Sequence, residues 1–72
     1  MVKVTSLFGH TYFYRCTPSG KIQRSDDGVR WRVAKNWSGK RVVMSNTTVK
    51  EVEEKIARKL DDPDRTLFVQ VI

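Results

Sequence analysis

The sequence predicts a small α+β fold, in which a mainly antiparallel sheet of about five short strands carries one helix on one face. Two observations lead to this prediction: short segments of alternating apolar and polar residues are separated by turn signals, and one later segment has helical periodicity. The expected order is β-β-β-β-α-β. The 72 residues make a single domain, 1–72, whose stability should be marginal because so short a chain buries little surface.

The expected strands share a period of two and are rich in β-branched and aromatic residues, as half-buried strands require. In the first of them, Val2 and Val4 alternate with Lys3 and Thr5. An Asp-Gly pair is a strong turn signal because glycine adopts positive φ at little cost. The segments that supply these strands are 1–8, 11–17, 29–36, 41–45 and 65–72, with a short piece at 21–24 between two turns, and the turns are 9–10, 18–21, 25–28 and 37–40.

Two strand segments have a sidedness that bears on function. In 29–36, two valines and Trp31 alternate with Arg30 and Arg32, so packing of the valine and tryptophan side on the helix would direct both arginines to solvent. The segment 65–72 is apolar on both sides, which favours a strand inside the sheet or covered on both faces, while a dimer edge is the alternative. We expect this last strand to pair with a strand of the first hairpin.

One helix is predicted between the fifth and the last strand segment. Thr48 fits the N-cap and Glu51 the third helical position of a capping box, in which the glutamate reaches back to the cap. The helix should end near residue 60, because Asp62 precedes a proline and resists helical geometry. The apolar stripe consists of Val49, Val52, Ile56 and Leu60.

Residues with catalytic or metal-binding chemistry are few. Cys16 is the only cysteine and His10 the only histidine, so an internal disulfide is impossible and a structural zinc site lacks ligands. A nucleophilic pair that meets across a hairpin is one interpretation of the two; the other, which we expect, is a turn residue for His10 and a small buried residue for Cys16. No phosphate-binding glycine loop or calcium-loop spacing occurs. We therefore expect no enzyme, no cofactor and no small-molecule substrate.

The location is expected to be cytoplasmic, either in the bacterial cytosol or in the host cell of a phage. A free thiol is typical of a reducing compartment. No apolar stretch approaches the length of a membrane span, and the first residues do not resemble a signal peptide. A membrane partner is therefore not expected.

The most informative functional signal is the distribution of charge. Residues 1–50 contain ten Lys and Arg against two Asp, whereas 51–72 contain four Lys and Arg against six acids. The first part carries +8 and the second −2, which together give the +6 of the chain. A basic segment attracts polyanions, so nucleic acid, with DNA favoured over RNA, is the first partner to test.

The basic residues gather around the expected hairpin that contains Arg30 and Arg32. Arginines two positions apart on a strand lie roughly 6.5–7 Å apart and can address successive phosphates or base edges, while a solvated face that discourages edge pairing is the alternative. Trp37 either stacks on a base or folds back over the sheet. The expected nucleic-acid-binding residues are Lys21, Arg24, Arg30, Arg32, Lys35, Trp37, Lys40 and Arg41.

The stretch 28–60 resembles the amino-terminal arm-binding domain of tyrosine recombinases, the integrases of phages and transposons. The matching residues are Trp31-Arg32-Val33, the turn Ser38-Gly39-Lys40-Arg41, and Thr48 at the start of a charged helix. The chain departs from the family in three ways: a Gly-Phe pair is missing before the capping threonine, no catalytic half follows, and extra strands flank the stretch. The resemblance implies that the sheet enters the DNA major groove and that Arg30, Arg32, Lys40 and Arg41 contact DNA.

A second, looser resemblance is to small phage proteins that bind and inhibit host machinery such as RNA polymerase, because these can share the β-β-α-β order of residues 29–72. It implies an alternative function, a phage- or prophage-type regulator that binds a host protein. A basic sheet together with an acidic end would orient such a partner. The acidic end consists of Asp61, Asp62 and Asp64.

The direction of Trp37 would separate these two functions. Clustering with Arg30 and Arg32 would favour nucleic acid, which stacks on aromatic rings and pairs with cations. Clustering with Phe68 and Ile72 in an apolar patch would favour a protein partner.

Overall fold

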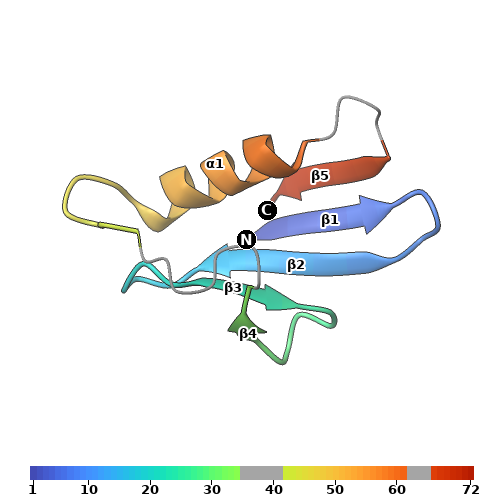
Figure 1. Cartoon of the computed structure of the whole chain (residues 1–72), viewed down its shortest axis with the longest axis horizontal. Coiled ribbons are helices and arrows are strands. Elements are labelled where there is room, and N and C mark those ends of the chain that lie inside the picture. Colours follow the sequence, from blue (N-terminus) through green and yellow to red (C-terminus); the bar gives the residue numbers. More distant parts are fainter. Residues whose placement is uncertain (35–41, 62–65) are drawn as a thin grey trace.

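The computed structural model describes residues 1–34, 42–61 and 66–72, and over these ranges it confirms the predicted α+β fold, an open five-stranded antiparallel sheet with one helix packed against it (Figure 1). The strand order across the sheet is β4-β3-β2-β1-β5. The elements are β1 (Val2–Ser6), β2 (Thr11–Cys16), β3 (Ile22–Ser25), β4 (Arg32–Val33), α1 (Val49–Leu60) and β5 (Leu67–Val71). Within the described ranges, no helix is long and apolar enough to cross a membrane.

Strand β5 returns to the first hairpin and pairs with β1, with Ser6 opposite Leu67. This confirms the expectation that the last strand lies beside a strand of that hairpin. Of the alternatives left open for this segment, a place inside the sheet is excluded, because β5 is an edge strand. Its two sides explain the difference: Leu67 and Val69 pack against the core, whereas Phe68 on the other side is 59% exposed.

The core lies between the sheet and α1. Residues directly opposite each other on neighbouring strands share a face of the sheet, as Val2 does with Tyr14 and Cys16 with Ile22. The apolar stripe of α1 covers this face, and the helix contacts β1, β2 and β5. The buried apolar residues are Val2, Val4, Tyr14, Cys16, Ile22, Ala34, Val52 and Ile56.

Helix α1 begins and ends as the sequence predicts, with one difference at its start. Thr48 is the N-cap, and its hydroxyl accepts the backbone N–H of Glu51 at 3.2 Å. The Glu51 carboxylate does not complete the capping box; it accepts instead from the hydroxyl of Thr47 at 2.8 Å. The Thr48 hydroxyl therefore satisfies one backbone N–H of the first turn, and the Glu51 side chain bonds to Thr47, the residue before the N-cap.

The segment 29–36 differs from the prediction, because its described part forms a strand only at Arg32–Val33. Val29 is 80% exposed and the β4 valine 54% exposed, so neither valine packs on the helix. The cause is the loop after β3. Oδ1 of Asp27 accepts the backbone N–H groups of Val29 and Arg30 at 2.8 and 2.9 Å, which holds them in a turn.

The strand expected at 41–45 is absent over 42–44, and residue 41 lies outside the described ranges. Val42 donates its N–H to the carbonyl of Gly20 at 2.9 Å, and Val42 and Met44 pack against the core. Gly20 has a φ of +90°, which confirms a turn at 18–21. The segment after residue 41 is thus attached to the sheet through a turn glycine, as an irregular chain rather than a strand.

Candidate functional site

The face of the sheet opposite α1 carries no helix in the described part of the chain. Lys3 lies opposite both Phe13 and Gln70, and Arg15 lies opposite Gln23, so these side chains share this face. We call the surface the helix-free face. Its strand positions are Lys3, Thr5, Thr11, Phe13, Arg15, Gln23, Ser25, Val33, Phe68 and Gln70.

The helix-free face is basic and aromatic. Its charged strand residues are Lys3 and Arg15, and none of its strand positions is acidic. Phe13 and Phe68 supply aromatic rings, and the remaining positions are mostly threonine and glutamine. Because no strand position of this face bears a carboxylate, no strand residue of the face neutralises the positive charges of Lys3 and Arg15, and these charges can attract an anion.

Arg15 is held in place by two neighbours. Its guanidinium carbon lies 4.1 Å from the centroid of the Trp31 ring, a cation–π contact, and its Nε donates to Oε1 of Gln23 at 2.8 Å. Trp31 therefore lies on the helix-free face, and the prediction that it packs in the core on the helix side is wrong. A guanidinium has five N–H donors, of which the bond to Gln23 engages one. The stacked guanidinium is thus held in one orientation by a ring and an amide oxygen.

Phe13 and Phe68 differ in how accessible they are. Gly28, in the loop after β3, lies over Phe13, because a Cβ on Gly28 would be 3.6 Å from the ring. Phe68 is 59% exposed. The two residues are two strands apart and offset by two positions, which places them roughly 12 Å from each other. Aromatic rings on an open sheet are surfaces on which unpaired bases can stack.

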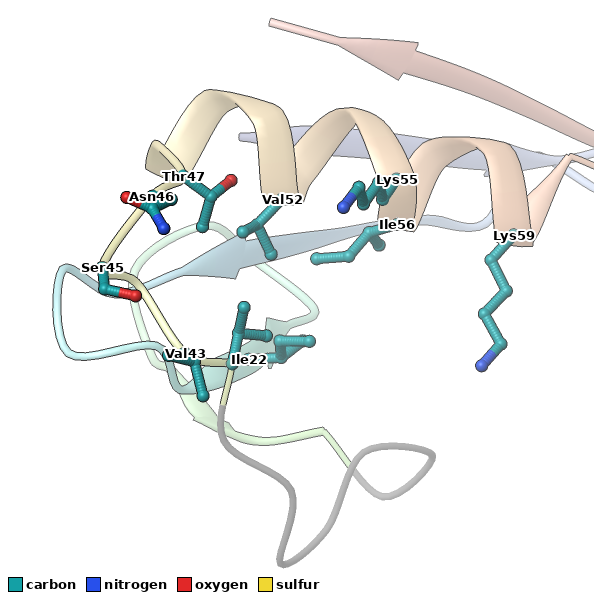
Figure 2. Close-up of a pocket in the computed structure, with 10 residues that line it drawn as sticks. Ile22, Val43, Ser45, Asn46, Thr47, Val52, Lys55, Ile56 and Lys59 are labelled. Carbon is teal, nitrogen blue, oxygen red and sulfur yellow. The ribbon is translucent and has the colours of Figure 1, made fainter.

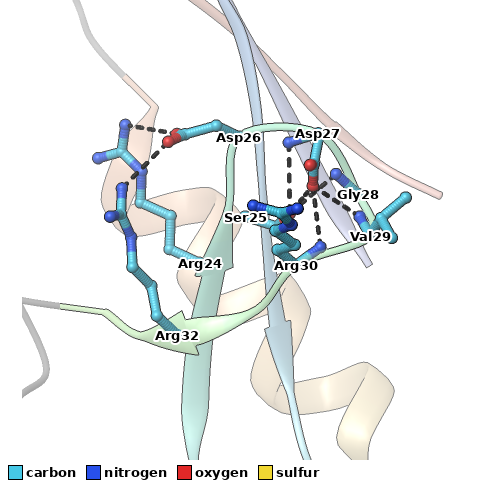
Figure 3. A network of polar contacts seen from close by, with 8 residues as sticks. All are labelled: Arg24, Ser25, Asp26, Asp27, Gly28, Val29, Arg30 and Arg32. Atoms are coloured by element: carbon cyan, nitrogen blue, oxygen red, sulfur yellow. Dashed lines mark hydrogen bonds and ion pairs between the residues drawn. The ribbon is translucent and has the colours of Figure 1, made fainter.

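Arg24 and Arg32 lie on the other side of the sheet. They are directly opposite each other, and Arg24 is also opposite the core residue Tyr14. Asp26 binds both, with 3.5 Å between Oδ1 and Nη2 of Arg24 and 3.0 Å between Oδ2 and Nη2 of Arg32 (Figure 3). Arg24 also stacks 4.2 Å from the centroid of Tyr12. The two arginines therefore share one carboxylate and are not a free phosphate clamp.

Arg30 lies in the loop between β3 and β4, so the prediction that it shares a strand face with Arg32 is wrong. Backbone N–H groups of Arg30 and Val29 donate to Asp27 and lower its pKa, which favours the ionised carboxylate. A hollow of about 310 Å³ beside this loop is lined by Asp26, Asp27, Arg30, Trp31 and Arg32. Its two carboxylates make it a poorer phosphate site than the helix-free face.

The predicted site residues do not form one surface. Lys21 is exposed in the turn before β3, and Arg24 and Arg32 meet only through Asp26. Several residues on which predictions rested lie outside the described ranges: Lys35, Trp37, Ser38, Gly39, Lys40, Arg41, Asp62 and Asp64. Sequence reasoning missed Lys3, Phe13, Arg15 and Phe68. Alternation was the available signal, because residues between core positions of a strand face the opposite side.

A groove of about 470 Å³ lies between α1 and residues 42–47 (Figure 2). Ile56 of the helix and Ile22 of β3 face each other across it, and Lys55 and Lys59 border it on the helix side. Its described lining contains no carboxylate, imidazole or thiol. The groove therefore offers no general base or nucleophile of these types.

His10 and Cys16 cannot meet across the hairpin as considered above. His10 lies in the turn before β2 and Cys16 ends that strand, whose six residues span roughly 17 Å. Cys16 is 4% exposed, which confirms the buried role, and burial followed by the nearby Glu53 charge raises the pKa of its thiol. Among the residues that the structure describes, no three His, Cys, Asp or Glu side chains are grouped to hold a metal ion.

These observations make the helix-free face the candidate binding surface. The helix-free face combines cations, aromatic rings and hydrogen-bonding side chains, with the Asp27 carboxylate bonded to the Ser25 hydroxyl at 3.0 Å, whereas Arg24 and Arg32 pair directly with Asp26. Comparisons with protein-family models, curated proteins and solved structures find no significant match for this chain.

Proposed function

We propose that the protein is a non-enzymatic nucleic-acid-binding module whose contact surface is the helix-free face. One observation carries the proposal: the sheet face that α1 does not cover places Lys3 and Arg15 among Phe13, Trp31 and Phe68 with no acidic strand position. The net charge of +6 supports the proposal, because a positively charged protein attracts polyanions.

The proposed mode of binding uses cations for the backbone and rings for the bases. Lys3 and Arg15 would contact phosphates, and Phe68, the most exposed ring of the face, would stack on a base. Stacking on a flat sheet requires bases that are free of a duplex, so single-stranded DNA or RNA is the favoured ligand. This differs from the major-groove contact that the integrase resemblance implies.

The first experiment is a titration of the protein against fluorescent single-stranded DNA, duplex DNA and RNA at 50 and 150 mM salt. Lys3→Glu is compared with Lys50→Glu, an equal change of charge on the exposed first turn of α1. We expect Lys3→Glu to weaken binding at least about fivefold more than Lys50→Glu, because only Lys3 lies on the contact face. If both variants fold and lose the same amount of affinity, the effect comes from net charge alone, and the helix-free face is rejected as the contact surface.

A second comparison tests stacking. Phe68→Ala should weaken single-strand binding about 5- to 100-fold, the range expected for one stacked base. Phe8→Ala is the matched control, since Phe8 is 90% exposed in the turn between β1 and β2 and is not one of the strand positions of the face. An unchanged affinity of Phe68→Ala would remove Phe68 from the proposed contact.

One observation supports the alternative of a host-protein partner. Leu7 and Phe8 are 61% and 90% exposed, and a bond of 3.3 Å from the Leu7 N–H to the Thr66 carbonyl brings this turn next to the start of β5, which bears Phe68. Exposed apolar side chains on adjacent segments are typical of a protein contact. If nucleic acid does not bind, a protein retained from host lysate by the wild type and lost with Phe8→Ser would support this function.

A further inference from the structure

We propose that the outer edge of β5 is a self-association surface, through which two copies of the chain pair their β5 strands antiparallel about a two-fold axis. The five-stranded sheet of each copy would then continue into the other. This inference rests on the backbone of β5 and not on the proposed function.

The backbone of β5 presents a regular set of hydrogen-bonding groups outward. Ile72 donates its N–H to Met1 and Thr66 accepts from Leu7, so the even-numbered residues of this segment bond to β1. In an antiparallel strand, alternate residues bond to opposite sides. The N–H and C=O groups of the odd-numbered residues therefore point away from the sheet. These residues are Leu67, Val69 and Val71.

The β5 edge lacks the features that normally prevent edge pairing. Its sequence, Leu-Phe-Val-Gln-Val, contains no charged residue and no proline. The opposite edge, β4, is only two residues long and carries the charged Arg32, and both features disfavour pairing with a further strand. An uncharged five-residue edge beside a short charged one indicates that β5 is the edge available to a second strand.

The positions of the outward groups select a symmetric register. Pairing centred on Val69 places Val69 opposite its own copy and Leu67 opposite Val71 of the second copy, so that all three outward residues exchange hydrogen bonds in both directions. Phe68 then lies opposite Gln70 of the second copy on the helix-free side, and Leu67 and Val71 continue the apolar row on the core side. The sequence of β5 is therefore compatible with its own antiparallel copy.

The first measurement is the solution mass at protein concentrations from about 1 to 500 μM, the range suited to an interface of this small size. The wild-type mass should rise from 8.4 kDa towards twice that value with increasing concentration. Nucleic acid is left out of these samples, so failure of the binding proposal would not affect the result. A mass that stays at 8.4 kDa throughout overturns the inference.

A charge-swap series tests both the edge and the register. Phe68→Glu with Gln70→Glu, and Phe68→Lys with Gln70→Lys, place like charges opposite each other twice in the dimer. Phe68→Lys with Gln70→Glu places opposite charges there instead. Both positions are exposed and face away from the core, so the fold of each variant should remain, as circular dichroism would verify.

We expect the two like-charge variants to dissociate at least about tenfold more readily than the opposite-charge variant. In a register shifted by one pair, Gln70 would face its own copy, and the Lys-Glu variant would then place two glutamates together. Equal association of all three variants, or association lost in all three, would overturn the proposed pairing.

Discussion

The carboxylate of Glu53 in α1 accepts the backbone N–H of Cys16 at the end of β2, with 3.1 Å between Oε2 and N. Strand β1 begins at Val2, opposite Tyr14, so the Cys16 amide lies beyond the end of its neighbouring strand. Oε1 of the same carboxylate lies 2.5 Å from the Met1 ammonium. Glu53 is 6% exposed, and a buried charge of this kind requires such partners. The residue thus connects the helix to two strands.

Replacing Glu53 with alanine should lower the free energy of unfolding by about 2–4 kcal/mol, because a buried N–H and an ammonium would both lose their acceptor. Glu53→Gln should cost less, since its amide oxygen still accepts from Cys16. Glu54→Ala is the control, and as a change at the half-exposed neighbouring position it should stay within about 0.5 kcal/mol. Urea unfolding measures all three. Equal costs for Glu53→Ala and Glu54→Ala would show that the buried contacts contribute nothing.

Replacing Asp26 with asparagine should destabilise the protein most at low salt. The carboxylate separates Arg24 and Arg32, which are directly opposite each other on β3 and β4. Without its charge, two like charges face each other across the strands at a cost of up to about 1 kcal/mol, and salt screens this repulsion. Unfolding at 10 and 500 mM salt measures it. The stability of the double variant, Asp26→Asn with Arg32→Ala, should no longer depend on salt in this way. If the salt dependence remains, repulsion between Arg24 and Arg32 is not its cause.

The sequence was sufficient for features that local signals determine. The N-cap hydroxyl of Thr48 and the 3.6-residue stripe that follows are local signals that give the start of α1 and the side that it buries. Alternation at Val2 and Val4 gives β1 its buried side. The same alternation places Lys3 on the opposite side, and because a single helix covers only one face, the helix-free face was within reach of sequence reasoning.

The side on which Arg32 lies depends on register, which local signals do not determine. A shift of one residue moves every side chain of a strand to the other face. Here Asp27 accepts the backbone N–H groups of Val29 and Arg30 and holds both residues in a turn. Strand β4 therefore has only two residues, and Arg32 lies opposite Arg24. The predicted arginine face assumed a full-length strand instead. The buried role of Glu53 could not be predicted for a similar reason, since it depends on β1 beginning opposite Tyr14, which leaves the Cys16 amide without a strand partner on that side.

Asp27 should make the stability of the protein sensitive to acid. Hydrogen bonds from the backbone N–H groups of Arg30 and Val29 and from the Ser25 hydroxyl lower the pKa of this carboxyl in the folded state. The unfolded chain therefore takes up a proton first, below about pH 4, and the stabilisation present above that pH is lost as the pH falls through the folded-state pKa. Thermal unfolding from pH 6 to 2 should show a shallower decline for Asp27→Asn than for wild type. Identical declines would contradict this role.

Cys16 should act as a slow reporter of opening between α1 and β2. Its burial raises the pKa of the thiol, and the Glu53 charge raises it further, so at pH 8 the folded chain holds less reactive thiolate than the unfolded one. A thiol reagent should therefore label the native protein at least about a hundredfold more slowly than the protein in urea.

Glu53→Gln should accelerate this labelling of Cys16 under native conditions, because the helix would be held less firmly against the end of β2 and the anionic neighbour would be gone. Glu54→Gln, which leaves the contact to Cys16 intact, should label at the wild-type rate. A rise common to both variants would point to a general loss of stability, whereas a rise confined to Glu53→Gln would assign control of the thiol to the carboxylate that bonds its backbone.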